Sequence, residues 1–192
     1  MKVAFLDRDG VINKFPGNGK YVTKVKDFHF LPGAREAIRD LTQAGYTLFV
    51  ISNQAGVGKG VYSRDKLQRI TRKMLTGVRR AGGKIKKVYY CTHRSDEGCD
   101  CRKPEIASIA KALKSLGKTL AFAKKSYFIG DTVTDMAAGR NAGCQTIFVL
   151  SGRSNVARLK KKRIKATHVA RNLLAASEII LNGHRKTGRK KR

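Results

Sequence analysis

The chain has 192 residues, 41% of them hydrophobic, and its 42 Lys and Arg against 13 Asp and Glu give a formal charge of +29. This length suits one domain with a sizeable core, and no apolar run approaches the roughly 18 residues of a membrane span. The charge predicts attraction to polyanions, and the lack of a signal-peptide pattern after Met1 leads us to expect a cytoplasmic protein.

The first half of the chain alternates predicted strands and helices. An apolar strand at residues 3–6 ends at Asp7-Arg8-Asp9-Gly10, and a polar loop covers residues 14–26. A short extended segment at 28–31, a helix at 34–44 and a second apolar strand at 46–52 follow. A Gly-rich loop then leads to Ser63, a suitable N-cap for a helix that runs to about Ala81.

The second half repeats this alternation. Strands are predicted at 85–90, 126–129 and 146–150, with an edge strand at 168–170, and helices at 106–116, 134–142 and 173–181. The pattern predicts an α/β fold, a Rossmann-like three-layer αβα sandwich with a central parallel sheet and no large cap domain. We assign residues 1–182 to a single domain and expect the basic tail, residues 183–192, to be disordered.

Four polar motifs follow predicted strands, and they contain most of the candidate catalytic residues. They are Asp7-Arg8-Asp9-Gly10, Ser52-Asn53-Gln54, Arg102-Lys103-Pro104, and Gly130-Asp131 with Asp135 one turn later. Because sites in open α/β sheets gather beyond the carboxyl ends of the strands, these motifs are expected to converge. Together they would supply a carboxylate nucleophile, a proton-shuttling carboxyl, polar donors, a lysine charge and ligands for a hard cation, which are the parts that phosphoryl transfer needs.

A second group of residues has the spacing of a metal site. Cys91, His93, Cys99 and Cys101 lie within eleven residues, and three thiols with one imidazole fit tetrahedral zinc. The alternatives are a disulfide pair, which the expected intracellular location argues against, or a set of unconnected free cysteines. A zinc ion with four protein ligands would be structural. Cys144 has no partner nearby and is expected in the core.

Four sequence motifs resemble those of the haloacid dehalogenase superfamily of phosphatases, in the subgroup of histidinol phosphatases and heptose-bisphosphate phosphatases. They are Phe-Leu-Asp-Arg-Asp-Gly-Val-Ile-Asn, Ile-Ser-Asn-Gln-Ala-Gly-Val, Cys-Asp-Cys-Arg-Lys-Pro and Tyr-Phe-Ile-Gly-Asp-Thr-Val-Thr-Asp, in the family's order between residues 2 and 150. The resemblance implies that Asp7 is the nucleophile that forms an aspartyl-phosphate and that Asp9 acts as acid and then base. It implies Mg²⁺ on a side-chain oxygen of Asp7, the backbone carbonyl of Asp9 and Asp131, and phosphate held by Ser52, Asn53 and Lys103. The subgroup also carries a Cys-His-Cys-Cys zinc loop.

Further residues are weaker candidates. Asp135 is expected to orient the water shell of the metal, and other carboxylates are expected around Asp9. Arg102 is a substrate-binding candidate because a guanidinium grips phosphate in a fixed fork. Lys59, in the Gly-rich loop, is a candidate contact for a second phosphate.

The expected substrate is a small phosphorylated metabolite, either a heptose 1,7-bisphosphate that loses its 7-phosphate or histidinol phosphate. The lack of a second, fused catalytic domain favours the heptose, whereas Thr132, where related heptose enzymes often have Lys, weakens that preference. The alternative is a nucleic-acid-associated phosphatase or a basic nucleic-acid-binding protein. The basic helix face at 64–80, the run at 158–165 and the tail support it, but only 7% of residues are aromatic, and Trp is absent, so no base-stacking platform is evident.

Overall fold

The predicted parallel sheet is confirmed. The computed structural model describes the backbone of residues 1–188 and the side chains of residues 1–183. In this part of the chain, six parallel strands lie in the order β3-β2-β1-β4-β5-β6. Their bounds are β1 Lys2–Leu6, β2 Tyr46–Asn53, β3 Ile85–Cys91, β4 Ser126–Gly130, β5 Gln145–Val149 and β6 His168–Ala170. The strand order reverses beside β1, which places the end of β1 at the switch point where α/β sheets bind ligands.

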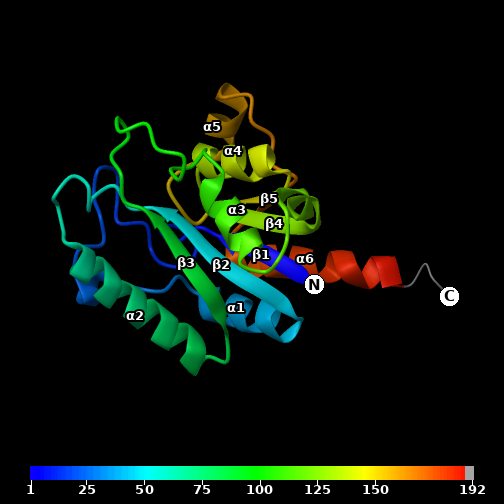
Figure 1. The fold of residues 1–192 in the computed structure, drawn as a ribbon. Coiled ribbons are helices and arrows are strands. Elements are labelled where there is room, and N and C mark those ends of the chain that lie inside the picture. The colour runs from blue at the N-terminus through cyan, green and yellow to red at the C-terminus, as the bar shows by residue number, and fades with distance from the viewer. Residues whose placement is uncertain (189–192) are drawn as a thin grey trace.

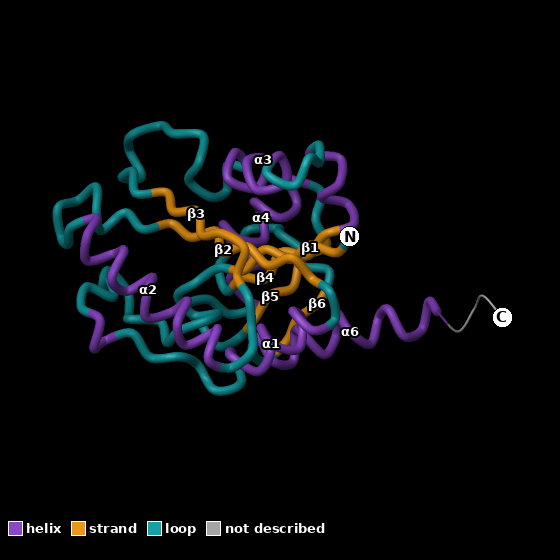
Figure 2. Tube along the Cα trace, turned by 60° about the horizontal axis from the view of Figure 1, so that its bottom comes forward, coloured by secondary structure: helices purple, strands orange, loops and turns teal. Residues whose placement is uncertain are grey.

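Helices cover both faces of the sheet (Figures 1 and 2). One face is covered by α1 (Ala34–Gln43), α2 (Arg64–Arg80) and α6 (Leu173–Gly188). The other is covered by α3 (Ala107–Lys114), α4 (Val133–Ala142) and α5 (Val156–Lys161). Two short 3₁₀ turns, η1 (Val25–Asp27) and η2 (Leu120–Lys125), lie in the connections. No helix of the described residues has the length and apolar character that crossing a bilayer requires.

The central strand β1 is buried on both faces and anchors the residues that follow it. Ala4 and Leu6 face the layer of α1, α2 and α6, while Val3 and Phe5 face the layer of α3 and α4. The Phe5 ring stacks on Phe49 of β2 and Phe128 of β4, with centroid separations of 5.9 and 6.2 Å. Because this core is closely packed, the backbone that enters Asp7 has little freedom to move.

Local signals account for most helix positions. Ser63 caps α2 as predicted, its hydroxyl accepting from the Lys66 N–H, and the apolar stripe of the helix is buried, namely Leu67, Ile70, Met74 and Val78. Helix α5 was not predicted, because six of the eight residues from 158 to 165 are cations and only Leu159 of the helix is buried. The predicted extended segment at 28–31 is a loop in which Phe30 forms a single bridge with Asn13.

The two edge strands of the sheet differ from the central strands. Strand β3 exposes Lys86 and Lys87 at one edge, and β6 has three residues at the other. Helix α6 continues to Gly188, past the Gly183 at which the sequence predicts a disordered tail. The last four residues of that predicted tail, 189–192, lie outside the described part of the chain.

Candidate active site

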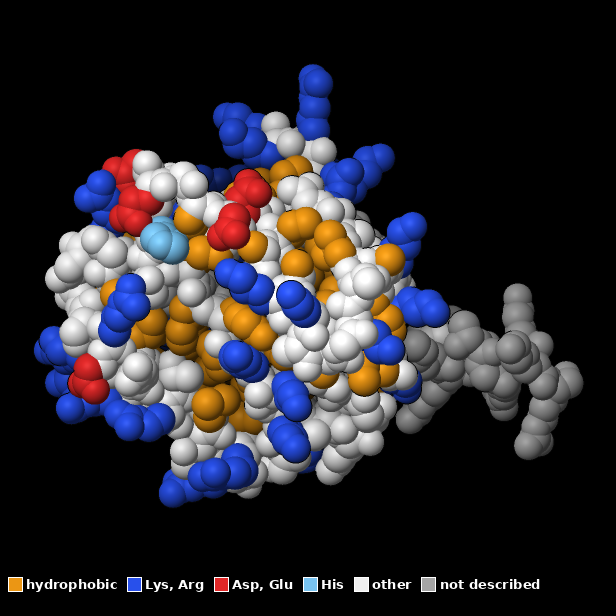
Figure 3. All heavy atoms as spheres, in the orientation of Figure 1, with side chains coloured by type: hydrophobic (Ala, Val, Ile, Leu, Met, Phe, Trp, Pro, Cys, Tyr) orange, Lys and Arg blue, Asp and Glu red, His pale blue; other side chains and the backbone are white. Residues whose placement is uncertain are grey.

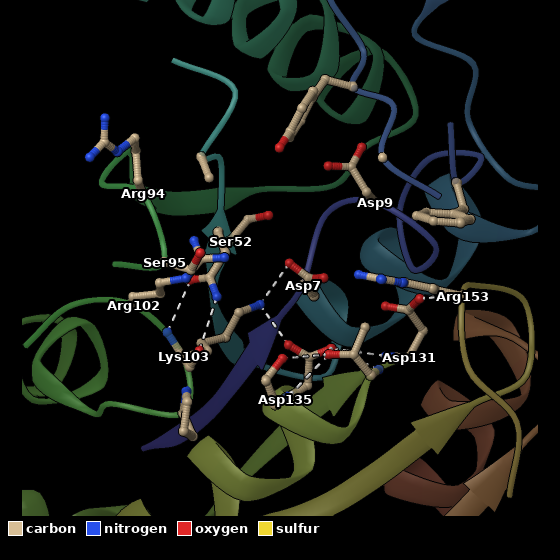
Figure 4. Close-up of a pocket in the computed structure, with 18 of the residues that line it drawn as sticks. Asp7, Asp9, Ser52, Arg94, Ser95, Arg102, Lys103, Asp131, Asp135 and Arg153 are labelled. Carbon is tan, nitrogen blue, oxygen red and sulfur yellow. Dashed lines mark hydrogen bonds and ion pairs between the residues drawn. The ribbon is translucent and has the colours of Figure 1, made fainter. Parts of the chain in front are cut away.

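The predicted site residues meet at one pocket. A cavity of about 720 Å³ lies over the carboxyl ends of β1, β2 and β4 (Figure 4). All nine residues predicted for catalysis, for the phosphate or for Mg²⁺ line it: Asp7, Asp9, Ser52, Asn53, Lys59, Arg102, Lys103, Asp131 and Asp135. The four predicted zinc ligands form a separate cluster at the end of β3. The expected convergence of the motifs at the strand ends is therefore what the fold produces.

Lys103 is the central cation of this pocket. Its ammonium lies 2.8 Å from Asp7 Oδ1 and 2.6 Å from Asp135 Oδ1, and it donates to the Ile51 carbonyl at 2.8 Å. The side chain is only 2% exposed. Two carboxylates and a carbonyl thus surround one buried ammonium, which offsets the cost of burying each charge alone.

Asn53 holds the backbone of Lys103. Its Oδ1 accepts from the Lys103 N–H at 3.0 Å, and its Nδ2 donates to the Lys103 carbonyl at 3.1 Å, next to the cis Lys103-Pro104 peptide bond. Both polar groups of the Asn53 side chain are therefore engaged with Lys103, which fixes the backbone that carries the ammonium, and the phosphate contact of Asn53 stays a prediction. The Ser52 hydroxyl faces the pocket and accepts from Gln54 Nε2 at 3.1 Å.

The carboxylates beside Lys103 fit a hard cation. Oxygen atoms of Asp7, Asp131 and Asp135 lie within 4.8 Å of one another. Asp131 is fully buried; its Oδ2 accepts from the Arg153 N–H at 2.6 Å, and its Oδ1 has no hydrogen-bond partner among the described residues. Since a buried polar atom without a partner is costly, this oxygen is suited to ligate an ion, and carboxylates are the ligands that Mg²⁺ prefers.

Burial raises the pKa values of two of these carboxyl groups. The pKa of Asp131 rises to about 8, chiefly through burial and then through the charges of Asp135 and Asp7. The pKa of Asp7 rises to about 6, with burial as the largest cause and the charge of Lys103 opposing it. A bound divalent cation would favour the ionised form of both groups.

Close backbone packing shapes the floor of the pocket. Gly10 has φ +85°, and a Cβ there would lie 2.5 Å from Asp131 Oδ2, while a Cβ on Gly152 would collide with the same carboxylate. Only glycine combines that backbone angle with so close an approach. The backbone segments after β1 and β5 therefore fix where Asp131 lies.

Asp135 is bound by protein groups on both oxygens. It forms a capping box at the start of α4, in which Oδ2 accepts from the Thr132 N–H at 2.9 Å and from the Asp131 N–H at 3.2 Å. Its Oδ1 forms the ion pair with Lys103. This arrangement suits the predicted indirect role, because both oxygens already have donors.

Asp9 has surroundings that the sequence did not predict. Instead of other carboxylates, it meets the buried Arg8 guanidinium at 2.9 Å, Asn13 Nδ2 at 2.9 Å and Gln54 Nε2 at 2.7 Å. Tyr62 donates to Gln54 Oε1 at 2.6 Å and so fixes the orientation of that amide. Figure 4 shows Asp9 apart from the ion-paired group of Asp7, Lys103 and Asp135.

Of these partners, Arg8 and Asn13 are close to Asp9 along the chain, whereas Gln54 reaches it across the fold. Gln54 comes from the end of β2, 45 residues along the chain, and Arg8 sits between the two motif aspartates with no exposed surface. The sequence did offer one signal for Arg8 and Gln54, because both belong to the polar motifs that follow β1 and β2.

Cationic side chains line the rim of the pocket. Arg102 donates to the His93 carbonyl at 3.4 Å, and Lys59 is exposed at the mouth. Two further arginines that the sequence did not single out also line it. Arg94 pairs with Asp96 at 3.0 Å, and Arg153 Nε donates to Asn18 Oδ1 at 3.1 Å. The position of Arg153 just after β5 was the signal for its presence here.

The thiol and imidazole cluster has tetrahedral dimensions. Cys99 Sγ lies 3.6 Å from Cys91 Sγ and 3.7 Å from Cys101 Sγ, while His93 Nδ1 lies 3.7 Å from Cys91 and 3.3 Å from Cys101. Ligands about 2.3 Å from a tetrahedral zinc are separated by about 3.8 Å, so the donor set fits that ion. No disulfide joins these thiols in the described residues, and Cys144 is buried in the core as predicted.

Comparison with known proteins gives one consistent result. A family model described as HAD-hydrolase-like matches residues 100–176. The chain is 33% identical over 176 residues to the D-glycero-beta-D-manno-heptose-1,7-bisphosphate 7-phosphatase of Pseudomonas aeruginosa, a match that covers 92% of this chain and 96% of that protein. The chain belongs to the haloacid dehalogenase-like family of phosphatases. The resemblance inferred from the four motifs is thus confirmed.

Two further matches bear on the site. The chain is 39% identical over 150 residues to the D-glycero-alpha-D-manno-heptose-1,7-bisphosphate 7-phosphatase of Campylobacter jejuni, covering 78% of this chain and 83% of that protein. The crystal structure of the D,D-heptose 1,7-bisphosphate phosphatase from B. bronchiseptica, complexed with magnesium and phosphate, has a TM-score of 0.87 at 30% identity. That match covers 95% of this chain and 99% of the other.

Proposed function

We propose that this chain is a Mg²⁺-dependent phosphatase that removes the 7-phosphate of a D-glycero-D-manno-heptose 1,7-bisphosphate through an aspartyl-phosphate on Asp7. The observation that carries the proposal is the ion pair of Lys103 with Asp7, beside the buried Asp131, at the switch point of the sheet. The identity and coverage of the matched heptose-bisphosphate phosphatases support the substrate.

The reaction has two displacement steps at phosphorus. Asp7 attacks the phosphorus atom, the bond to the sugar oxygen breaks, and Asp9 gives that oxygen a proton. Water then attacks the aspartyl-phosphate, Asp9 takes a proton from this water, and inorganic phosphate leaves with Asp7 restored. Asp9 must turn away from Arg8 and Gln54 to reach the leaving oxygen, because both groups bind its carboxylate in this structure.

Charge compensation makes the first attack feasible. Lys103 neutralises Asp7 and would contact the incoming phosphate, and Ser52 would donate to it. Asp7, Asp131 and the backbone carbonyl of Asp9 would hold Mg²⁺, with Asp135 orienting its water. When bound, the ion withdraws charge from the phosphate oxygens.

Rim cations suit the second phosphate of a bisphosphate substrate. Arg102 and Lys59, joined by Arg94 and Arg153, surround a cavity of about 720 Å³. The second phosphate of a bisphosphate would bring negative charge to this rim. Histidinol phosphate has no second phosphate. This charge arrangement favours the heptose bisphosphate over histidinol phosphate, whereas the cationic rim alone would also accept a phosphorylated nucleic-acid end.

We further infer a structural zinc ion on Cys91, His93, Cys99 and Cys101 that stabilises the loop carrying Arg102 and Lys103. A thiolate ligand set for zinc suits a reducing compartment such as the cytoplasm. We assign the activity to one domain, residues 1–182.

A substrate panel tests the proposal. Phosphate release is measured with Mg²⁺ on the alpha and beta anomers of heptose 1,7-bisphosphate, on histidinol phosphate and on a 3′-phosphorylated oligonucleotide, and phosphorus NMR identifies which sugar phosphate is lost. We expect one heptose anomer to have the highest kcat/KM and to lose its 7-phosphate. Asp7→Asn should abolish turnover and leave the fold intact, whereas Asp27→Asn, at an exposed acid outside the pocket, should change neither. Strong turnover of the oligonucleotide alone would overturn the proposed substrate. An active Asp7→Asn variant would overturn the proposed mechanism.

A further inference from the structure

One segment of the chain has no exposed carboxylate. Residues 106–177 contain two acids, Asp131 and Asp135, and both are fully buried in the active site. The same segment carries fourteen Lys and Arg, and every one is exposed: Lys111, Lys114, Lys118, Lys124, Lys125, Arg140, Arg153, Arg158, Lys160, Lys161, Lys162, Arg163, Lys165 and Arg171. We call these fourteen side chains the cationic face.

The fold gathers most of this segment on one side of the molecule. Helices α3, α4 and α5, with η2, cover the same face of the sheet, and α4 and α5 share a small core through Met136 and Leu159. Figure 3, in the orientation of Figure 1, shows Lys and Arg side chains projecting around α5 at the top of the view. The bordering acids along the chain are Glu105 and Glu178.

The opposite helical layer differs in that two of its cations are paired with acids, although among the described residues Lys66, Arg72, Arg79 and Arg80 of α2 form no salt bridge either. There, Arg69 pairs with Asp65 at 2.8 Å and Arg39 with Asp40 at 2.9 Å. Among the described residues, no member of the cationic face forms a salt bridge. The mutual repulsion of these charges is therefore relieved by no internal partner, and an external polyanion would relieve it.

We propose that the cationic face binds the phosphodiester backbone of duplex nucleic acid, an activity beyond the proposed phosphatase reaction. Each Lys or Arg that neutralises a phosphate releases a condensed counterion, so a broad array of unpaired cations gives strong, salt-dependent binding. The aromatic residues of the segment offer no stacking platform: Tyr127, Phe128 and Phe148 are buried, and Phe122 is partly buried beneath Lys118. Binding is therefore to the backbone, independent of base sequence, rather than to unstacked single strands.

An anionic membrane fits this surface less well. Helices that lie on membranes present a large apolar face to the lipid. Here the apolar sides of α3, α4 and α5 are packed into the cores, and the exposed large hydrophobic residues of the segment, Leu120, Leu150 and Val169, lie outside these helices. The surface offers charge without an apolar anchor.

Two matched variants test the proposal. The first replaces Lys114, Lys124, Arg140 and Lys160 of the cationic face by Gln; the second replaces Lys66, Arg72, Arg79 and Arg80, four exposed cations of α2, by Gln. Both variants have the same net charge, and none of these residues lines the active-site pocket, so phosphatase activity reports an intact fold. Binding to a duplex DNA of random sequence is measured by fluorescence anisotropy over a range of salt concentrations.

We expect the first variant to bind about tenfold or more weakly, with a slope of log affinity against log salt that is shallower by about 3 to 4, since each lost phosphate contact removes about 0.9. The second variant should stay within about threefold of the wild type, because fewer phosphate contacts are lost. If both variants lose the same amount of DNA affinity, the binding depends only on net charge and the proposal is overturned. So would binding to phosphatidylserine vesicles without binding to DNA, or no binding by the wild type. None of these outcomes bears on the phosphatase assay.

Discussion

The two polar clusters of this protein are built in opposite ways. The carboxylate cluster of Asp7, Asp131 and Asp135 draws its members from the ends of β1 and β4 and the start of α4, and a lysine from a fourth segment compensates its charge. The cysteine and histidine cluster takes all four donors from residues 91–101. The first cluster therefore exists only when the sheet is formed, whereas the second constrains one loop of eleven residues.

This difference divides the roles of the two clusters. The carboxylate cluster keeps an oxygen of Asp131 without a hydrogen-bond partner among the described residues, so it can still gain a ligand and act in chemistry. The four donors of the other cluster would complete the coordination of the proposed zinc ion and leave no position for substrate. The link between them is Arg102-Lys103, which directly follows Cys101 and delivers the buried ammonium to Asp7.

Removal of that ammonium should have the largest effect. Lys103→Gln leaves Asp7 and Asp135 without their shared cation, so we expect kcat to fall by about a hundredfold or more. Steady-state phosphate release measures the change. Lys59→Gln is the control, since it removes an exposed rim cation and should alter mainly KM. Similar kcat losses in both variants would mean that Lys103 acts only through overall charge.

Loss of a thiol should show what the cysteine and histidine cluster contributes to stability and to kcat. Cys99→Ser is expected to release zinc, lower the melting temperature and reduce kcat, because the segment that carries Lys103 loses its anchor. Metal analysis by mass spectrometry and thermal unfolding measure these changes. Cys144→Ser, at a buried thiol outside the cluster, should keep the zinc. If the Cys99 variant retains a full zinc content, the assignment of that ligand is wrong.

The carboxylate cluster should bind Mg²⁺ in a pH-dependent way. With pKa values raised to about 8 at Asp131 and about 6 at Asp7, protons compete with the cation more strongly as pH falls. We expect the affinity for Mg²⁺ to drop by up to about tenfold per unit between pH 8 and pH 6, as measured by titration calorimetry. An Mg²⁺ affinity that stays the same from pH 8 to pH 6 would contradict this prediction. Loss of zinc from the cysteine and histidine cluster over the same pH range would also contradict it.

The smallest effect is expected at Asn53, which holds the backbone of Lys103. Asn53→Ala removes both hydrogen bonds to the Lys103 backbone and should lower kcat severalfold while Mg²⁺ affinity stays unchanged, because the metal ligands are untouched. Asn141→Ala is a matched control, since Asn141 reaches the same segment through one exposed contact of 3.4 Å to the Pro104 carbonyl. A large change in KM without a change in kcat would favour a direct phosphate contact for Asn53.

The sequence was sufficient where signals are local or follow from topology. Apolar runs located the central strands, Ser63 marked the start of α2, and the rule for strand ends brought Asp7, Ser52 and Asp131 to one pocket. The contact of Asp9 with Gln54 could not be predicted, because it depends on how the ends of β1 and β2 are placed side by side.

Helix α5 shows a second limit. Asn155 caps it through the Arg158 N–H, which is a local signal, but the surrounding cations hide the single buried residue, Leu159. With one buried residue in a helix of six, periodicity has little to detect. The sequence shows these cations as a basic run, and the fold adds which other cations lie on the same face of the sheet.

The two edge strands of the sheet, β3 and β6, also affect whether the protein aggregates when it is concentrated. An unpaired strand edge invites strands from other molecules, and exposed lysines or a very short strand discourage this. Lys86 and Lys87 on β3 provide the first safeguard, and the three residues of β6 provide the second. The sheet is thus closed to growth at both edges, which lets a chain with a largely apolar centre stay dispersed instead of forming intermolecular β-structure.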